Sequence, residues 1–86
     1  MARYRIEFAP AAARQLESLS RKEQMRIASR IDALASDPRP PGCLKLRGSE
    51  DIYRIRAGDH RILYQVKDDV LLILVVKVAH RREAYR

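Results

Sequence analysis

The C-terminal stretch VAHRREAYR gathers groups that could handle an anion, directly behind an apolar run that ends at Ala79. Its hydrogen-bond donors and positive charges come from His80, Arg81, Arg82, Tyr85 and Arg86. Arginine binds phosphate through a planar, bidentate fork, and nearby cations favour the ionised form of a tyrosine. These residues are therefore candidates for a site that binds an anion, although a solubilising tail would have a similar composition.

A second group of arginines is expected to converge when two strands pair. The stretches DIYRIRA and HRILYQVK are joined by a Gly-Asp pair, which is typical of a two-residue hairpin loop. This turn pairs Arg56 with Arg61, and the alternation of side chains along a strand puts Arg54 on the same face. Directly opposed cations repel each other unless an anion is bound beside them. We predict an anion site formed by Arg54, Arg56 and Arg61.

The remaining sequence predicts the scaffold that positions these groups. YRIEF alternates like a half-buried strand, Pro10 suits the first turn of a helix, and SRKE has capping-box spacing at the start of a second helix. Three strands follow the stiff DPRPPG loop, with reversals at Gly58-Asp59 and Asp68-Asp69. The predicted fold class is α+β with the order β-α-α-β-β-β, in which an antiparallel sheet carries a helix pair on one face.

The last predicted strand, VLLILVVKVA, is apolar on both faces. Alternation turns residues such as Leu71 and Val75 toward the helices, and it turns residues such as Val76 toward the face that bears the arginines. An apolar patch beside a cationic one usually marks a surface that a partner covers. We therefore expect a partner on this face.

Length and composition fit a single folded domain over residues 1–86. Eighteen Lys and Arg residues against eleven Asp and Glu give a net charge of +7, and fourteen of the eighteen are arginine. A domain this basic is expected to meet a polyanion such as nucleic acid, the ribosome or an acidic protein. A single cysteine, with no long apolar run and no secretory leader, suggests a cytoplasmic protein that does not bind membranes. No cluster of His, Asp, Glu and Cys has ligand spacing, so neither a metal nor a cofactor is expected.

Three stretches strongly resemble the RelE group of bacterial and archaeal toxin–antitoxin toxins, within the wider RelE/ParE superfamily: KLRG at 45–48, YRIRAGDHRILYQV at 53–66 and VAHRREAYR at 78–86. The resemblance extends over the whole chain, and HRREAYR is its most specific part. It implies a small microbial-ribonuclease-like domain that enters the ribosomal A site and cuts mRNA there. It also implies a cognate antitoxin that wraps the toxin in a hetero-oligomer and neutralises it.

The resemblance places Arg54, Arg56, Arg61, Arg81 and Tyr85 on the catalytic positions of the family. The implied reaction is attack of the ribose 2′-OH on the adjacent phosphate, which leaves a 2′,3′-cyclic phosphate and a 5′-OH. Arg61 would bind the scissile phosphate, Arg81 would lie near the leaving group, and Tyr85 would be the base. Well-studied members carry lysines where this chain has Arg54 and Arg56. Because arginine does not readily lose its proton, these two residues can clamp phosphate but cannot act as a base.

Several alternatives stay open from the sequence. Histidine side chains in general can exchange a proton near neutral pH, so His80 and His60 are other candidates for the base. A ParE-like protein would inhibit DNA gyrase by binding alone and would not need Tyr85, and a catalytically inactive relative would only bind the antitoxin. Contacts to RNA or ribosome phosphates are expected from Lys45, Arg47, Arg82 and Arg86.

Overall fold

A computed structural model of the chain describes residues 3–48 and 51–80. The elements in chain order are β1 (Arg5–Phe8), α1 (Pro10–Glu17), α2 (Arg21–Leu34), β2 (Leu44–Lys45), β3 (Ile52–Ala57), β4 (His60–Lys67) and β5 (Leu72–His80). A 3₁₀ turn, Asp68–Val70, joins β4 to β5. The predicted α+β fold, with two helices between the first strand and the later ones, is confirmed. None of the helices in the described ranges is long and apolar enough to cross a membrane.

The five strands form one sheet in the order β1-β5-β4-β3-β2. Neighbours from β2 to β5 are antiparallel, as predicted, but β1 pairs with β5 in parallel, with Ile6 opposite Ile73. Three reversals make β5 antiparallel to β2, and β5 lies beside β1 and runs in the same direction as β1. The sheet is therefore mixed rather than wholly antiparallel.

Both helices begin where the sequence signals predict. Pro10 is the first residue of α1, where the lack of an N–H costs no hydrogen bond. Ser20 caps α2: its hydroxyl accepts a hydrogen bond from the Glu23 N–H at 3.3 Å and donates one to the Glu23 carboxylate at 3.0 Å. The last residue of α2 is Leu34, four residues before Pro38. A helix that continued through Pro38 would lack the N–H that bonds the Leu34 carbonyl, and the proline ring would clash with that carbonyl.

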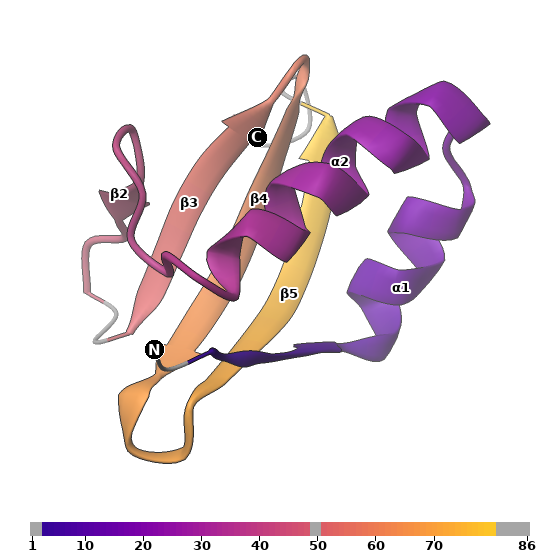
Figure 1. The fold of residues 1–86 in the computed structure, drawn as a ribbon. Coiled ribbons are helices and arrows are strands. Elements are labelled where there is room, and N and C mark those ends of the chain that lie inside the picture. The colour runs from indigo at the N-terminus through magenta and orange to yellow at the C-terminus, as the bar shows by residue number, and fades with distance from the viewer. Residues whose placement is uncertain (1–2, 49–50, 81–86) are drawn as a thin grey trace.

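The core lies between the helices and one face of the sheet. Figure 1 shows α2 lying across this face, with α1 beside it. Ile27 and Ile31 of α2 and Ile55, Ile62 and Tyr64 of the sheet are at most 2% exposed. Since side chains alternate along each strand, the neighbours of these sheet residues project from the opposite side. We call that side of β3, β4 and β5 the open face.

A β-bulge in β5 changes which of its residues reach the open face. Tyr64 pairs with Val75, but the preceding residue, Leu63, pairs with Lys77, so Val76 is an extra residue in the strand. Beyond the bulge Val78 is buried, and Lys77 and Ala79 take the open face. The place opposite Leu63, which an unbroken alternation would give to Val76, therefore belongs to Lys77.

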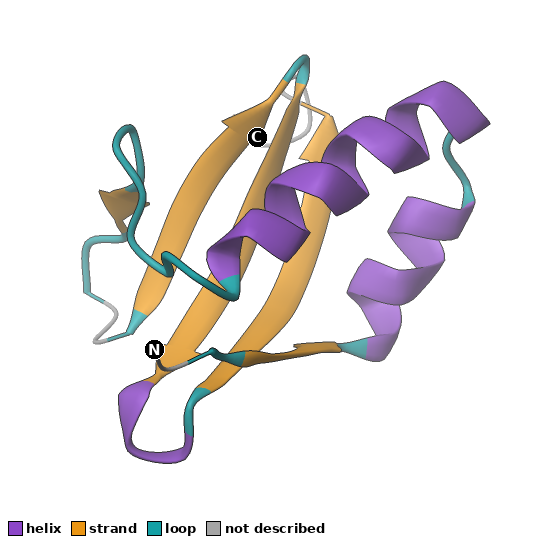
Figure 2. Ribbon diagram, in the orientation of Figure 1, coloured by secondary structure: helices purple, strands orange, loops and turns teal. Residues whose placement is uncertain are grey.

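The connection between β4 and β5 also differs from the predicted two-residue hairpin loop at Asp68-Asp69. Figure 2 shows a short helical turn there, which the chain leaves through Leu71. Leu71 has a φ of 52° and is 40% exposed. The prediction that Leu71 faces the helices is therefore wrong. The turn includes Val70 and Leu71, which the sequence predicts as part of the last strand, and β5 begins at Leu72.

A polar cluster fastens the proline-rich loop to the β4–β5 turn. Arg39 donates two hydrogen bonds to the Asp68 carboxylate, at 2.8 and 3.3 Å, and the Tyr4 hydroxyl donates a third at 2.5 Å. Arg39 also donates to the Tyr53 hydroxyl at 3.0 Å, and the Tyr64 hydroxyl donates to the carbonyl of Pro38 at 2.8 Å. The hydrogen bonds from Arg39, and then from Tyr4, lower the pKa of Asp68. These contacts fix the start of the segment that leads to the site described next.

Candidate functional site

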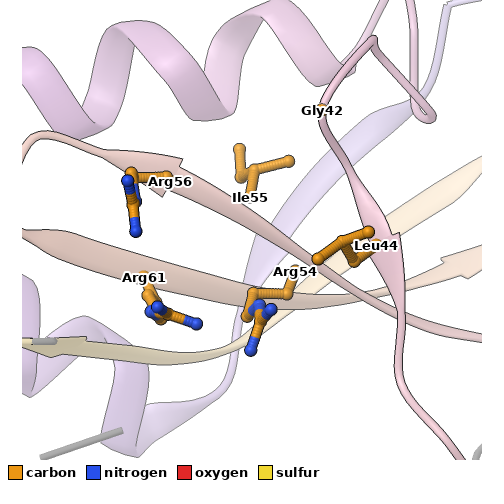
Figure 3. A pocket seen from close by; sticks show the side chains of 6 residues that line it. All are labelled: Gly42, Leu44, Arg54, Ile55, Arg56 and Arg61. Atoms are coloured by element: carbon orange, nitrogen blue, oxygen red, sulfur yellow. The ribbon is translucent and has the colours of Figure 1, made fainter.

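Three arginines of the β3–β4 hairpin share the open face. Arg56 lies directly opposite Arg61, which confirms the predicted register, and Arg54 lies opposite Leu63 one row further along. Gly58 begins the turn with a φ of 63°, a left-handed conformation that glycine adopts without strain. In Figure 3 the three arginine side chains project to one side of the hairpin, away from Ile55, which points toward the helices.

A pocket of about 250 Å³ opens between these arginines and β2. We call it the arginine pocket; its lining residues are Gly42, Leu44, Arg54, Ile55, Arg56 and Arg61. Leu44 lies opposite Arg54 and forms an apolar wall, and none of the lining residues is acidic. Pockets for drug-sized ligands have volumes of roughly 300–1,000 Å³, so this pocket suits a smaller group, and its three cations favour an anion.

Arg61 is the most buried of the three arginines. It is 5% exposed, whereas Arg56 is exposed and Arg54 is half-buried. Its row on the sheet runs from Arg56 through Arg61 to Ala79, whose small side chain leaves room for the guanidinium. Arginine stays charged in proteins, and its charge acts more strongly on a bound anion where the surroundings exclude water. Arg61 is thus a fixed positive charge at the back of the pocket.

The two histidines face the other way. His60 pairs with His80 at the end of β4 and β5, and their rings meet edge to face with centroids 5.4 Å apart. Nδ1 of His60 lies 3.6 Å from the Glu23 carboxylate, and both histidines line a hollow with Gln15 of α1. The sheet separates this hollow from the arginine pocket. The structure therefore does not bring His60 or His80 to the arginines, contrary to their candidacy as the base. No group of three or more His, Cys, Asp or Glu side chains within residues 3–48 and 51–80 could hold a metal ion.

The remaining residues predicted for the site fall into two groups. Lys45 of β2 lies opposite Tyr53 of β3, and Arg47 follows β2 in the chain. Both Lys45 and Arg47 are exposed, and neither lines the arginine pocket. The second group lies outside the described residues and consists of Arg81, Arg82, Tyr85 and Arg86.

Sequence reasoning missed two parts of the pocket wall. Gly42 and Leu44 enter it from the loop after α2, and β2 is only two residues long, too short for its alternation to be read from sequence. The PPG turn was the available signal, because a glycine after two prolines marks a sharp change of direction. The sequence alone also could not show that Ala79 lies opposite Arg61, because this pairing depends on the bulge in β5.

Comparison with known proteins agrees with this architecture. A model of the family described as the ParE toxin of the type II toxin–antitoxin system parDE matches residues 6–85. A RelE-like toxin protein of Escherichia coli is 34% identical over 84 residues, which are 95% of this chain and 87% of that protein. RelE-type proteins are also among the structural neighbours. The archaeal RelE–RelB complex of Pyrococcus horikoshii OT3 contains a chain with a TM-score of 0.82 and 30% identity, over 94% of this chain and 97% of that one.

The intact RelBE toxin–antitoxin complex of Escherichia coli gives a TM-score of 0.79 at 26% identity, over 90% of this chain and 95% of the matched chain. Family match, sequence relatives and fold therefore agree with one another and with the motifs of the hairpin. The chain belongs to the RelE/ParE toxin family and is a RelE-type toxin of a type II toxin–antitoxin system.

Proposed function

We propose that this toxin is an endoribonuclease that cuts mRNA in the ribosomal A site and so stops translation. The observation that carries the proposal is the arginine pocket, in which Arg54, Arg56 and the buried Arg61 line one small hollow with no acidic residue in its wall. Opposed cations of this kind are unfavourable in an empty protein and favourable around a phosphate that gains negative charge.

The proposed chemistry is attack of a ribose 2′-OH on the adjacent phosphate, giving a 2′,3′-cyclic phosphate and a 5′-OH. Arg61 binds the scissile phosphate from the back of the pocket, and Arg54 and Arg56 clamp its oxygens as charge develops. Preorganised donors at such a position stabilise the transition state because they need not reorganise during the reaction. By resemblance to the family, Tyr85 takes the proton of the 2′-OH and Arg81 assists the leaving 5′-oxygen.

The proposed partners follow from charge and from the relatives. A net charge of +7 favours binding to ribosomal RNA, with Lys45, Arg47, Arg82 and Arg86 as contacts to its phosphates. The matched chains of Pyrococcus horikoshii and Escherichia coli are bound to RelB antitoxins. We extend this to a cognate antitoxin that binds the present toxin, with both proteins acting in the cytoplasm.

The direct test is a cleavage assay with purified toxin, programmed ribosomes and end-labelled mRNA. Cuts should map to the A-site codon, the upstream fragment should carry a cyclic phosphate, and the downstream fragment should have a 5′-OH that polynucleotide kinase can label. Intact mRNA under conditions in which the toxin is bound to the ribosome would contradict the proposal.

A cellular experiment separates this function from gyrase inhibition. When the toxin is induced without antitoxin, incorporation of labelled amino acids should fall before DNA synthesis or plasmid supercoiling changes. An earlier loss of supercoiling would favour a ParE-like activity, and unimpaired growth would favour an inactive relative that only binds antitoxin.

A further inference from the structure

A second hollow lies next to the arginine pocket on the open face. Its volume is about 230 Å³, and we call it the apolar hollow. Its lining residues are Leu46, Arg54, Leu63, Lys77 and Ala79. Arg54 belongs to both hollows, so a molecule that places one group in the arginine pocket can place a neighbouring group here.

The apolar hollow exists because of the bulge in β5. One row of the open face runs Arg54, Leu63, Lys77 across β3, β4 and β5. With a regular register, Lys77 would point toward the helices and Val76 would fill this row. Bulges near active sites commonly re-aim side chains in this way. Here the bulge places a cation at the far rim of the hollow and the small Ala79 in its wall.

The chemistry of the hollow is that of a flat apolar group with a polar edge. Leu46, Leu63 and Ala79 give an apolar floor, which does not suit a phosphate. Arg54 and Lys77 stand at two sides, and both offer hydrogen-bond donors but no acceptor. RNA-binding proteins hold unstacked bases against apolar side chains and the planar face of arginine. The hollow is large enough for one base, and its apolar floor, rather than its volume, distinguishes it from the arginine pocket.

We infer that the apolar hollow binds one of the two nucleobases that flank the scissile phosphate, with Arg54 between base and phosphate. Because Arg54 and Lys77 are donors only, the hollow favours a base with a keto oxygen at purine C6 or pyrimidine C4, guanine or uracil, over one with an amino group there, adenine or cytosine. The inference rests on the proposed nuclease function and adds a source of sequence preference to it.

The test compares cleavage of ribosome-bound mRNAs whose A-site codons differ only at the two positions beside the cut. At one of these positions the wild-type toxin should cut keto-base codons about tenfold faster than amino-base codons, the size expected for one good base contact. An abasic nucleotide at that position should slow cleavage to the rate of the disfavoured bases, and this comparison needs no change to the protein.

Lys77→Glu is the matching change on the protein. Lys77 is exposed, so the substitution should not impair folding, and a carboxylate accepts hydrogen bonds from amino groups. The preference should shift from keto toward amino bases. Lys22→Glu, the same charge change on the exposed side of α2, should slow all codons equally and leave the preference unchanged.

The outcomes separate the two proposals. If the wild-type toxin cuts none of the mRNAs, the nuclease function is wrong and the base site falls with it. If the toxin cuts them but abasic nucleotides beside the cut have no effect, the base site is overturned and the nuclease function stands. An unchanged base preference in Lys77→Glu likewise overturns the site.

Discussion

Arg56 and Arg61 lie directly opposite each other across the β3–β4 hairpin, with both side chains on the open face. Like charges in directly opposed positions of a sheet destabilise it. Arg30 of α2 donates a hydrogen bond to the backbone carbonyl of Arg56 at 3.2 Å, a contact that does not depend on the Arg56 side chain. An anion bound between the two side chains would offset this repulsion, and both arginines line the arginine pocket.

Replacing Arg56 by glutamine should stabilise the free toxin while weakening its activity. We expect the free energy of unfolding to rise by about 0.2–1 kcal/mol, the range for cross-strand pairs. The gain should shrink at high salt, because the repulsion that it relieves is screened. Urea unfolding at low and high ionic strength measures both effects. Arg30→Gln, which removes a cation from α2 but not from the opposed pair, serves as the control and should give no salt-dependent gain.

Arg61 should be the most important arginine for cleavage. Arg61→Ala removes a buried cation from the pocket and should cost about 2–4 kcal/mol of transition-state stabilisation, the range for loss of one preorganised donor. Single-turnover cleavage of ribosome-bound mRNA measures this loss. Arg61→Lys keeps the charge but not the bidentate fork, so its rate should lie between those of wild type and Arg61→Ala.

A folding control accompanies this prediction, because Arg61 is 5% exposed and its removal leaves space in the sheet. Thermal unfolding of both variants should remain cooperative, and both should still bind ribosomes. Wild-type cleavage by Arg61→Ala would remove Arg61 from the mechanism.

The hydrogen bonds that Arg39 and Tyr4 donate to the Asp68 carboxylate predict that the stability of the toxin decreases in acid. Because Asp68 has a lowered pKa in the folded toxin, the folded state binds fewer protons than the unfolded state. The stability that the Asp68 carboxylate contributes is fully present when the pH is above 3.8, the ordinary pKa of aspartate. This stability is lost as the pH falls through the lower pKa that Asp68 has in the folded toxin. Asp68→Asn should therefore be less stable than wild type at pH 7, and this difference should vanish in strong acid. Denaturant unfolding across this range measures the difference, and Asp69→Asn, one residue away, should show no such convergence.

The hairpin at the centre of the site could be predicted because its turn fixes its register. Gly58 begins a two-residue loop, and once that loop is set, every cross-strand pair of β3 and β4 follows, including Arg56 with Arg61. The capped start of α2 at Ser20 was equally local, since a serine hydroxyl and a glutamate three residues later satisfy the free N–H groups. Features determined within a few residues were thus predictable from the sequence.

The other strand of the site could not be predicted in full, because its sequence lacks a usable alternation. β5 is apolar on both sides as far as Val76, so a one-residue insertion leaves no trace in the pattern. Only pairing with β4 shows that Lys77 and Ala79 reach the open face and that His80 does not. The parallel partner of β1 was likewise undetermined, because alternation gives the faces of a strand but not its neighbour.

The position of His80 makes the identity of the base testable. His80 and its partner His60 lie on the helix side of the sheet, so neither can reach a ribose that is bound over the arginine pocket. His80→Gln should therefore cut mRNA at nearly the wild-type rate. Tyr85→Phe keeps the aromatic ring and removes its ionisable oxygen, so cleavage should fall by about two to four orders of magnitude, the range for loss of a general base.

Single-turnover rates measured across pH complete this comparison. With tyrosine as the base, the wild-type rate should rise with pH as the phenol ionises, His80→Gln should keep that slope, and Tyr85→Phe should lose it. Binding to ribosomes should be the same in all three proteins, because the cations of the open face are unchanged. A Tyr85→Phe toxin that retains the wild-type rate and slope would exclude the base role. A loss of activity in His80→Gln, with ribosome binding intact, would mean that the histidine side of the sheet contributes to catalysis.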